Sequence, residues 1–286
     1  MKNRIILTGA LLSAVLMTGS AQASLLVREE FNTTGGPDMA NGLYTSGFDL
    51  GDAGNSNAVG GTIVGFSASD AWTDTAYIES YANAMRILST KYNWTTTGRA
   101  IATSMAGKTE AYAKMTMRQH LGNASASFGY AVAGFANSAA LGYGAGAAIS
   151  YEWDNTNSRW DLALRYATGG TGKYVTIQED APYDTTQEIY WFMDEDNDTI
   201  KVWVDEDDYS AAADLTVTDW EGTVQGISHV SSGGRESGFS TADYVYVYDI
   251  ALGDTGEDDG RIPEPGTLSL LGMATLGALL IRRLKM

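Results

Sequence analysis

The chain of 286 residues has no cysteine, only 2 histidines and only 4 prolines. Without cysteine it can form neither disulfides nor thiolate metal sites, and it has no cysteine nucleophile. His120 and His229 lack the spacing of a metal-ligand pair, and no Gly-x-Ser-x-Gly segment is present to carry a nucleophilic serine. The sequence therefore excludes thiol chemistry and gives no support for zinc or Ser-His chemistry.

Basic residues are scarce as well, with 18 against 35 acidic residues and a formal net charge of -17. Five of the basic residues lie at the two ends, so residues 24–262 keep 13 basic and 34 acidic side chains, a charge of about -21. Such a surface repels phosphate backbones and anionic lipid headgroups. We therefore expect no nucleic-acid partner. With 44% apolar and 10% aromatic residues, the chain still has enough apolar surface for a packed core.

The first 23 residues have the layout of an export signal. Lys2 and Arg4 precede an apolar run over residues 5–17, and the small-residue site Ala21-Gln22-Ala23 follows. This order is typical of a secretory signal peptide, whose apolar part is too short to span a bilayer. The sequence predicts a signal helix over 1–23 and a domain over 24–253.

The last residues combine a stiff tripeptide with a short apolar segment. An acidic linker over 254–262 leads to Pro263-Glu264-Pro265, and we expect residues 254–267 to pack against nothing. Two prolines around one residue can continue neither a helix nor a strand ladder. The following apolar run, 268–281, is 14 residues long, about 21 Å as a helix against about 30 Å of hydrocarbon. The run is thus a marginal anchor, and Arg282-Arg283 should stay on the cytoplasmic side.

This order of tripeptide, apolar helix and basic end over 263–286 resembles the PEP-CTERM sorting signal of Gram-negative-type bacteria. The resemblance implies that an exosortase in the inner membrane recognises Pro263, Glu264 and Pro265, with Arg282 and Arg283 closing the signal. It also implies transient residence in the inner membrane, cleavage near the tripeptide and export to the cell surface or an exopolysaccharide matrix. Sortase and GPI signals fit less well, because no Leu-Pro-x-Thr-Gly is present and the chain ends in a basic cluster.

Between these ends the sequence predicts short strands separated by Gly, Asn, Asp and Ser. No amphipathic crossover helix stands between successive segments, which disfavours a parallel sheet. The fold class expected is therefore all-β, an antiparallel β-sandwich. The fourteen segments are 25–31, 62–66, 85–89, 99–105, 111–117, 127–135, 147–153, 160–166, 174–178, 188–193, 199–204, 215–218, 224–228 and 244–252.

Two hairpins are the clearest local predictions. Segments 147–153 and 160–166 flank the polar cluster 154–159, and segments 189–193 and 200–204 flank 194–199. In 160–166, Trp160, Leu162, Leu164 and Tyr166 alternate with Asp161, Ala163 and Arg165, which places the apolar set on one face. We expect these hairpins to form neighbouring strands inside one antiparallel sheet.

The second hairpin and the final strand, 244–253, resemble parts of concanavalin A-like lectin/glucanase jelly rolls, a resemblance that covers about residues 25–253. It implies a jelly roll in which the last strand pairs near the first. The glucanases of this class carry their catalytic carboxylates on one strand as Glu-x-Asp-x-Glu, because alternation points every second side chain into one cleft. No such run occurs in this chain, so the sequence predicts no catalytic residue.

Asp194, Asp196 and Asp198 alternate like the start of a calcium loop, with Asp205 at the position of the last ligand. Thr199 occupies the position that requires glycine, and Asp205 replaces the bidentate glutamate. The sequence thus favours a solvated hairpin turn, with adventitious calcium binding as the alternative.

Aromatic side chains are the remaining candidates for function. The chain has 7 Trp and 16 Tyr, and aromatic rings stack on pyranose faces while polar side chains hold hydroxyls. A loop-rich region carries Trp72, Tyr77, Tyr81, Tyr92 and Trp94. We therefore expect an exported, non-enzymatic surface or matrix protein whose partner is extracellular polysaccharide. The alternatives are a polysaccharide-active hydrolase or lyase with an unrecognised carboxylate site, and a structural surface protein without a ligand.

Overall fold

The structure is a computed structural model, and it describes part of the chain. The described residues are 25–30, 63–64, 78–81, 84–88, 95–121, 129–139, 141, 144–207, 209–236 and 244–254. The predicted signal helix, most of the acidic linker and the predicted C-terminal helix lie outside them. In the part of the chain that the structure describes, no helix is long and apolar enough to cross a membrane.

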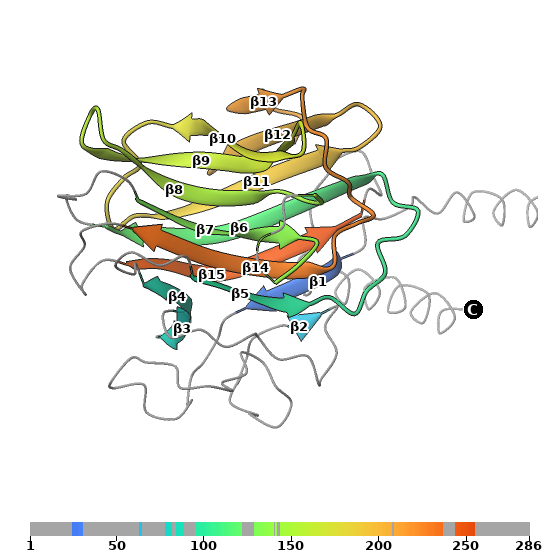
Figure 1. Cartoon of the computed structure of the whole chain (residues 1–286), viewed down its shortest axis with the longest axis horizontal. Helices are drawn as coiled ribbons and strands as arrows, with labels where there is room; N and C mark the ends of the chain where they lie inside the picture. The colour runs from blue at the N-terminus through green and yellow to red at the C-terminus, as the bar shows by residue number, and fades with distance from the viewer. Residues whose placement is uncertain are drawn as a thin grey trace, which may run out of the picture.

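The described residues form fifteen strands and no α-helix (Figure 1). The strands are β1 (Leu25–Glu30), β2 (Ile63–Val64), β3 (Ile78–Tyr81), β4 (Ala84–Leu88), β5 (Thr95–Ala100), β6 (Glu110–His120), β7 (Gly129–Ala136), β8 (Ala148–Asp154), β9 (Arg159–Thr168), β10 (Thr171–Gln178), β11 (Thr186–Asp194), β12 (Thr199–Val204), β13 (Leu215–Val217), β14 (His229–Glu236) and β15 (Tyr244–Gly253).

These strands form two sheets. A nine-stranded sheet has the order β13-β12-β11-β6-β15-β1-β2, with β4 also paired to β15 and β3 to β4, and a six-stranded sheet has the order β10-β9-β8-β7-β14-β5. The chain runs as a meander through β7 to β10 in one sheet and through β11 to β13 in the other. It then places β14 beside β7 and β15 beside β6, which is a jelly-roll arrangement. The two layers face each other in Figure 1, and the predicted all-β antiparallel sandwich is confirmed.

Alternation along each strand directs one set of side chains into the space between the sheets. The 11 residues of β6 alternate strictly between buried and half-buried positions. The buried set includes Met115 and Met117 of β6, which share the core with Trp191 of β11 and Leu162 and Leu164 of β9. Burying a side chain of this size contributes about 1.5–3 kcal/mol relative to leaving it exposed. The sandwich is therefore held mainly by this inter-sheet layer.

Two glycines allow β7 to approach β8 and the segment before it closely. A Cβ atom on Gly134 would lie 2.4 Å from the Cα atom of Ala148 in the neighbouring strand. Gly146 has a φ of 68° and its Cβ would lie 2.4 Å from the carbonyl oxygen of Phe135. Neither position has room for a side chain, and residues 144–146 form a bend before β8.

Both predicted hairpins are present, in opposite sheets. β8 pairs with β9 in the six-stranded sheet, and β11 pairs with β12 in the nine-stranded sheet. The expectation that they share one sheet is therefore wrong, because β10 ends one meander and the chain crosses to the other layer before β11. The expected pairing of first and last strands is confirmed, since β1 pairs with β15.

Two strand predictions need correction, and two strands were missed. The segment predicted over 99–105 is a strand only at its start, because β5 ends at Ala100. The segment 224–228 is a turn, in which the Ile227 amide donates to the Val224 carbonyl at 3.0 Å. Strands β3 and β14 were not predicted; β14 reads His-Val-Ser-Ser-Gly-Gly-Arg-Glu, a composition with low β-propensity. Pairing with β7 on one side and β5 on the other overrides this local preference.

The acidic linker was expected to pack against nothing, and its first residue does not follow that expectation. The Asp254 carboxylate accepts a hydrogen bond from the Lys108 ammonium at 2.5 Å. The ordered contacts of the sandwich therefore extend one residue past β15.

Candidate functional site

The outer face of the six-stranded sheet carries a cluster of polar and aromatic side chains. On β7, β8, β9 and β10, the residues that alternate with core positions point away from the other sheet. The outward set includes the five residues that we call the outer-face cluster: Tyr130, Ser150, Glu152, Arg165 and Tyr174.

An arginine-carboxylate pair forms the centre of the outer-face cluster. The Arg165 Nε and Nη2 atoms donate to Glu152 Oε1 and Oε2 at 2.6 and 2.7 Å. The Ser150 hydroxyl also donates to Glu152 Oε1. The two charged side chains are only 14% and 9% exposed. Bidentate pairing of this kind fixes the orientation of both groups.

Two tyrosine rings flank the guanidinium of Arg165. Its central carbon lies 3.9 Å from the centroid of the Tyr130 ring and 5.5 Å from that of Tyr174. Tyr174 is 55% exposed, so much of its ring can contact a ligand. The rigid Arg165–Glu152 pair therefore lies beside the exposed ring of Tyr174.

Residues 138, 139 and 141 cover another part of the same sheet face. The Ser231 hydroxyl of β14 donates to the Ser138 carbonyl at 2.7 Å, and Leu141 is buried against Val132 and Ala148. Close approach between Gly98 and Ala139 continues this cover over β5. The outer-face cluster thus lies beside this packed segment, on the part of the face formed by the start of β7 and by β8, β9 and β10.

Burial changes the proton affinity of the central carboxylate. Removal of Glu152 from water raises its pKa above the ordinary 4.5, and the hydrogen bonds and charge of Arg165 oppose this rise. Asp161 lies directly opposite Glu152 on the neighbouring strand, where Cβ atoms are about 5 Å apart. Asp161 accepts a hydrogen bond from the Asp180 amide at 2.9 Å and forms an ion pair with Arg159 at 3.0 Å.

The sequence did not identify this carboxylate pair, because its two members lie on different strands. A search for acidic residues that alternate along one strand cannot pair Glu152 with Asp161, and it cannot find the arginines that bind them. One signal was present: the alternation of 160–166 already placed Asp161 and Arg165 on the polar face of the strand. Register between β8 and β9 was needed to bring Glu152 beside them.

The residues singled out from the sequence lie elsewhere. Asp194, Asp196 and Asp198 belong to the turn between β11 and β12, where Asp194 accepts hydrogen bonds from the amide and the side chain of Asn197 at 3.1 and 2.7 Å. Thr109 donates to Asp196 at 3.0 Å. Among the described residues, no three His, Cys, Asp or Glu side chains gather in a way that could hold a metal ion. The turn is therefore held by the Asp194–Asn197 hydrogen bonds and by Thr109 from the segment before β6.

The sorting-signal residues and most of the proposed sugar-stacking aromatics lie outside the described residues. This holds for Pro263, Glu264, Pro265, Arg282 and Arg283, and for Trp72, Tyr77, Tyr92 and Trp94; Tyr81 ends β3. The roles assigned to these residues stay predictions.

Comparison with known proteins gives matches only among solved structures. No family model and no curated protein matches the chain. The potassium-bound carbohydrate recognition domain of Emp46p aligns with a TM-score of 0.43 and 10% identity, over 63% of this chain and 87% of that one. The CBM2 module of the evolved Dit of Lactobacillus casei BL23 phage J-1 aligns with a TM-score of 0.45 and 11% identity, over 83% and 98%.

A β-1,3-glucanase from Mycobacterium marinum aligns with a TM-score of 0.40 and 12% identity, over 62% of this chain and 77% of that one. Similarities of this size carry no argument about the activity of this chain. Its fold and its outer-face cluster are therefore defined by its own strands and contacts.

Proposed function

We propose that this chain is an exported, non-enzymatic glycan-binding protein of the cell surface or extracellular polymer layer, and that the outer-face cluster is its binding site. The observation that carries the proposal is the exposed Tyr174 ring beside the fixed Arg165–Glu152 pair. An aromatic ring packs on the apolar face of a sugar, and adjacent charged groups exchange hydrogen bonds with its hydroxyls. The strongly acidic chain suits a neutral glycan better than a polyanion.

A glycan array tests the proposal with a matched pair of variants. Tyr174 and Tyr183 are both 55% exposed. Tyr183, however, contacts His120 of β6, which lies on the outer face of the nine-stranded sheet. Tyr174→Ala should weaken binding about tenfold, because stacking and its buried area contribute about 1.5 kcal/mol. Tyr183→Ala should bind like the wild type. Equal losses in both variants would contradict the assigned site, and no binding by the wild-type chain would favour a purely structural surface protein.

A second candidate function is polysaccharide hydrolysis at the same cluster. It is favoured by the raised pKa of Glu152 and by the opposed position of Asp161, because glycosidases use two carboxyl groups of which one has a raised pKa. Against it, both oxygens of Glu152 are already bonded to Arg165. Release of new reducing ends by the wild type, abolished in Glu152→Gln, would establish the hydrolase; binding without such release supports the non-enzymatic function.

Export completes the proposal, and it depends on the two ends of the sequence. A 14-residue apolar run holds a protein only weakly in a bilayer, yet it can delay the chain while a processing enzyme of the exosortase type reads Pro263-Glu264-Pro265. Replacing Glu264 by Ala, or both prolines by Ala, should leave export through the N-terminal signal intact but keep the protein at the inner membrane with its C-terminus attached. Mass spectrometry of the surface-located wild-type chain decides the point, since an intact end at Met286 would contradict sorting by cleavage.

A further inference from the structure

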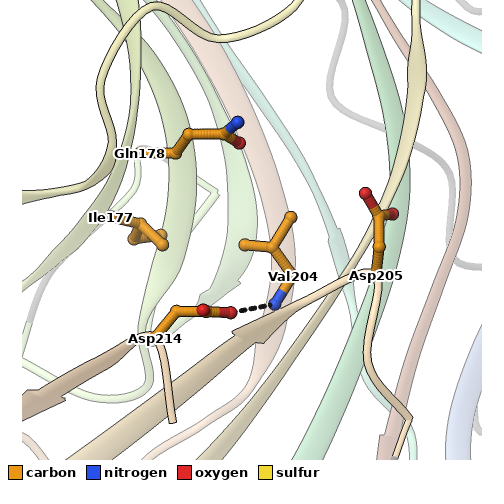
Figure 2. A pocket seen from close by; sticks show the side chains of 5 residues that line it. All are labelled: Ile177, Gln178, Val204, Asp205 and Asp214. Atoms are coloured by element: carbon orange, nitrogen blue, oxygen red, sulfur yellow. Dashed lines mark hydrogen bonds between the residues drawn. The ribbon is translucent and has the colours of Figure 1, made fainter.

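A pocket of about 320 Å³ opens at the side of the sandwich where both sheets end. Its walls come from β10, which is the last strand of the six-stranded sheet, and from the β12–β13 side of the nine-stranded sheet. The lining residues are Ile177, Gln178, Val204, Asp205 and Asp214 (Figure 2). None of them belongs to the outer-face cluster. Volumes of this order suit a small ligand.

The two carboxylates of the pocket are held in place by backbone hydrogen bonds. The Asp205 amide donates to the Glu188 carbonyl at 2.7 Å, and the Glu188 amide donates to Asp205 Oδ1 at 2.8 Å. The Val204 amide donates to Asp214 Oδ2 at 2.8 Å, as the dashed line in Figure 2 shows. Among the described residues, no hydrogen bond reaches the second oxygen of either carboxylate. Each carboxylate therefore offers one positioned acceptor.

A chain of buried hydrogen bonds orients the side-chain amide of Gln178. The amide therefore offers donors to the pocket, whereas the two carboxylates offer acceptors. The Tyr151 hydroxyl donates to Gln187 Oε1 at 3.2 Å, and Gln187 Nε2 donates to Gln178 Oε1 at 2.8 Å. Tyr151 and Gln187 are 0% and 2% exposed. Burial raises the pKa of Tyr151, so its hydroxyl keeps its proton and acts as the donor. The amide of Gln178 is thereby oriented, and its two N–H groups are left for the pocket.

We propose that this pocket binds one hexosamine unit with a free, protonated amino group. The ammonium and a neighbouring hydroxyl donate to the free oxygens of Asp205 and Asp214, and a second hydroxyl oxygen accepts from Gln178. Ile177 and Val204 contact the carbon face of the ring. Both aspartates are exposed, so water solvates them when no cation is bound; a neutral or N-acetylated sugar binds less tightly because it cannot form the charge-assisted hydrogen bonds. This second site is independent of the one proposed on the outer face.

Ligand-observed NMR titration of the purified full-length chain tests the pocket, with glucosamine, glucose and N-acetylglucosamine as probes. The wild type should bind glucosamine about three- to fivefold more tightly than either neutral sugar, because the ammonium forms charge-assisted hydrogen bonds with two exposed carboxylates. The double variant Asp205→Asn/Asp214→Asn should lose this preference. Asn keeps both backbone hydrogen bonds, and it tolerates the φ of 55° at position 205, so the fold should be retained.

The matched control is Glu206→Gln/Asp207→Asn, which removes two negative charges from the adjacent segment but none from the pocket lining. This control should keep the preference for glucosamine. Equal affinity for glucosamine and glucose in the wild type, absence of glucosamine binding, or a preference that survives in the Asp205→Asn/Asp214→Asn variant would each overturn the proposal. Tyr174→Ala should leave glucosamine binding at the pocket unchanged, so failure at one site is distinguishable from failure at the other.

Discussion

Arg165 connects a buried carboxylate with two tyrosine rings on the outer face of the six-stranded sheet. Its side chain is 14% exposed, and its Glu152 partner is 9% exposed. Taking charges out of water is costly, and the cost is offset only while both partners and their hydrogen bonds are present. The pair therefore makes the site rigid, but it leaves the site dependent on a single residue.

Removing Arg165 alone should be far more costly than removing the whole pair. Arg165→Ala leaves the Glu152 charge buried without its partner and should lower the free energy of unfolding by about 3–5 kcal/mol. Arg165→Met with Glu152→Gln should cost less, because no uncompensated charge remains. Urea unfolding of the three proteins measures both differences. A double variant less stable than Arg165→Ala would contradict this account.

At the scale of elements, the two central hairpins use the same turn. Asp154 accepts hydrogen bonds from the amide and the side chain of Asn157, as Asp194 does from Asn197. In both turns the following residue is left-handed, with φ of 54° at Ser158 and 52° at Asp198. A carboxylate at the first position and an asparagine three residues later thus reverse the chain twice, once in each sheet.

The hydrogen bonds of the β11–β12 turn predict that two nearby aspartates contribute differently to stability. Asp194→Ala removes charge-assisted hydrogen bonds from a carboxylate that is largely buried, and should destabilise the fold by about 1.5–3 kcal/mol. Asp196→Ala removes the same charge from an exposed position of the same turn and should cost no more than about 0.5 kcal/mol. Thermal unfolding of both variants tests the difference, and equal shifts would show that charge, rather than turn geometry, matters.

At the scale of the whole molecule, the sandwich buries many tyrosine hydroxyls of a chain that has 16 tyrosines. Burial raises the pKa of Tyr151, Tyr166, Tyr209 and Tyr246 above the ordinary 10.0. The unfolded chain thus ionises these groups at lower pH than the folded chain does. Their contribution to stability is fully present below pH 10.0 and is lost as the pH rises through the raised values.

Alkaline unfolding should therefore be cooperative. Above pH 10.0 the free energy of unfolding should fall steadily, and the buried tyrosines should ionise only as the sheets separate. Tyrosinate absorbance and far-UV circular dichroism, followed together across this range, test the prediction. If all the tyrosinate absorbance developed while the strand signal was unchanged, burial would not control these hydroxyls.

Several features were predictable because they depend on neighbours in the chain. The alternation of 160–166 determined the inner and outer faces of β9, and the polar clusters at 154–159 and 194–199 determined the two hairpin turns. The all-β class follows from the same local patterns. The export signals at 1–23 and 263–286 are also local, and they stay predictions because they lie outside the described residues.

Other features depend on residues that only the tertiary structure brings together. β14 has a sequence unsuited to a strand, and its place between β7 and β5 comes from pairing on both sides. The meeting of Glu152 with Arg165 depends on the register of β8 against β9. The pocket joins Gln178 to Asp205 and Asp214 from the other sheet. Local patterns carry no information on such encounters, because strand order and register are decided by the packing of the two sheets.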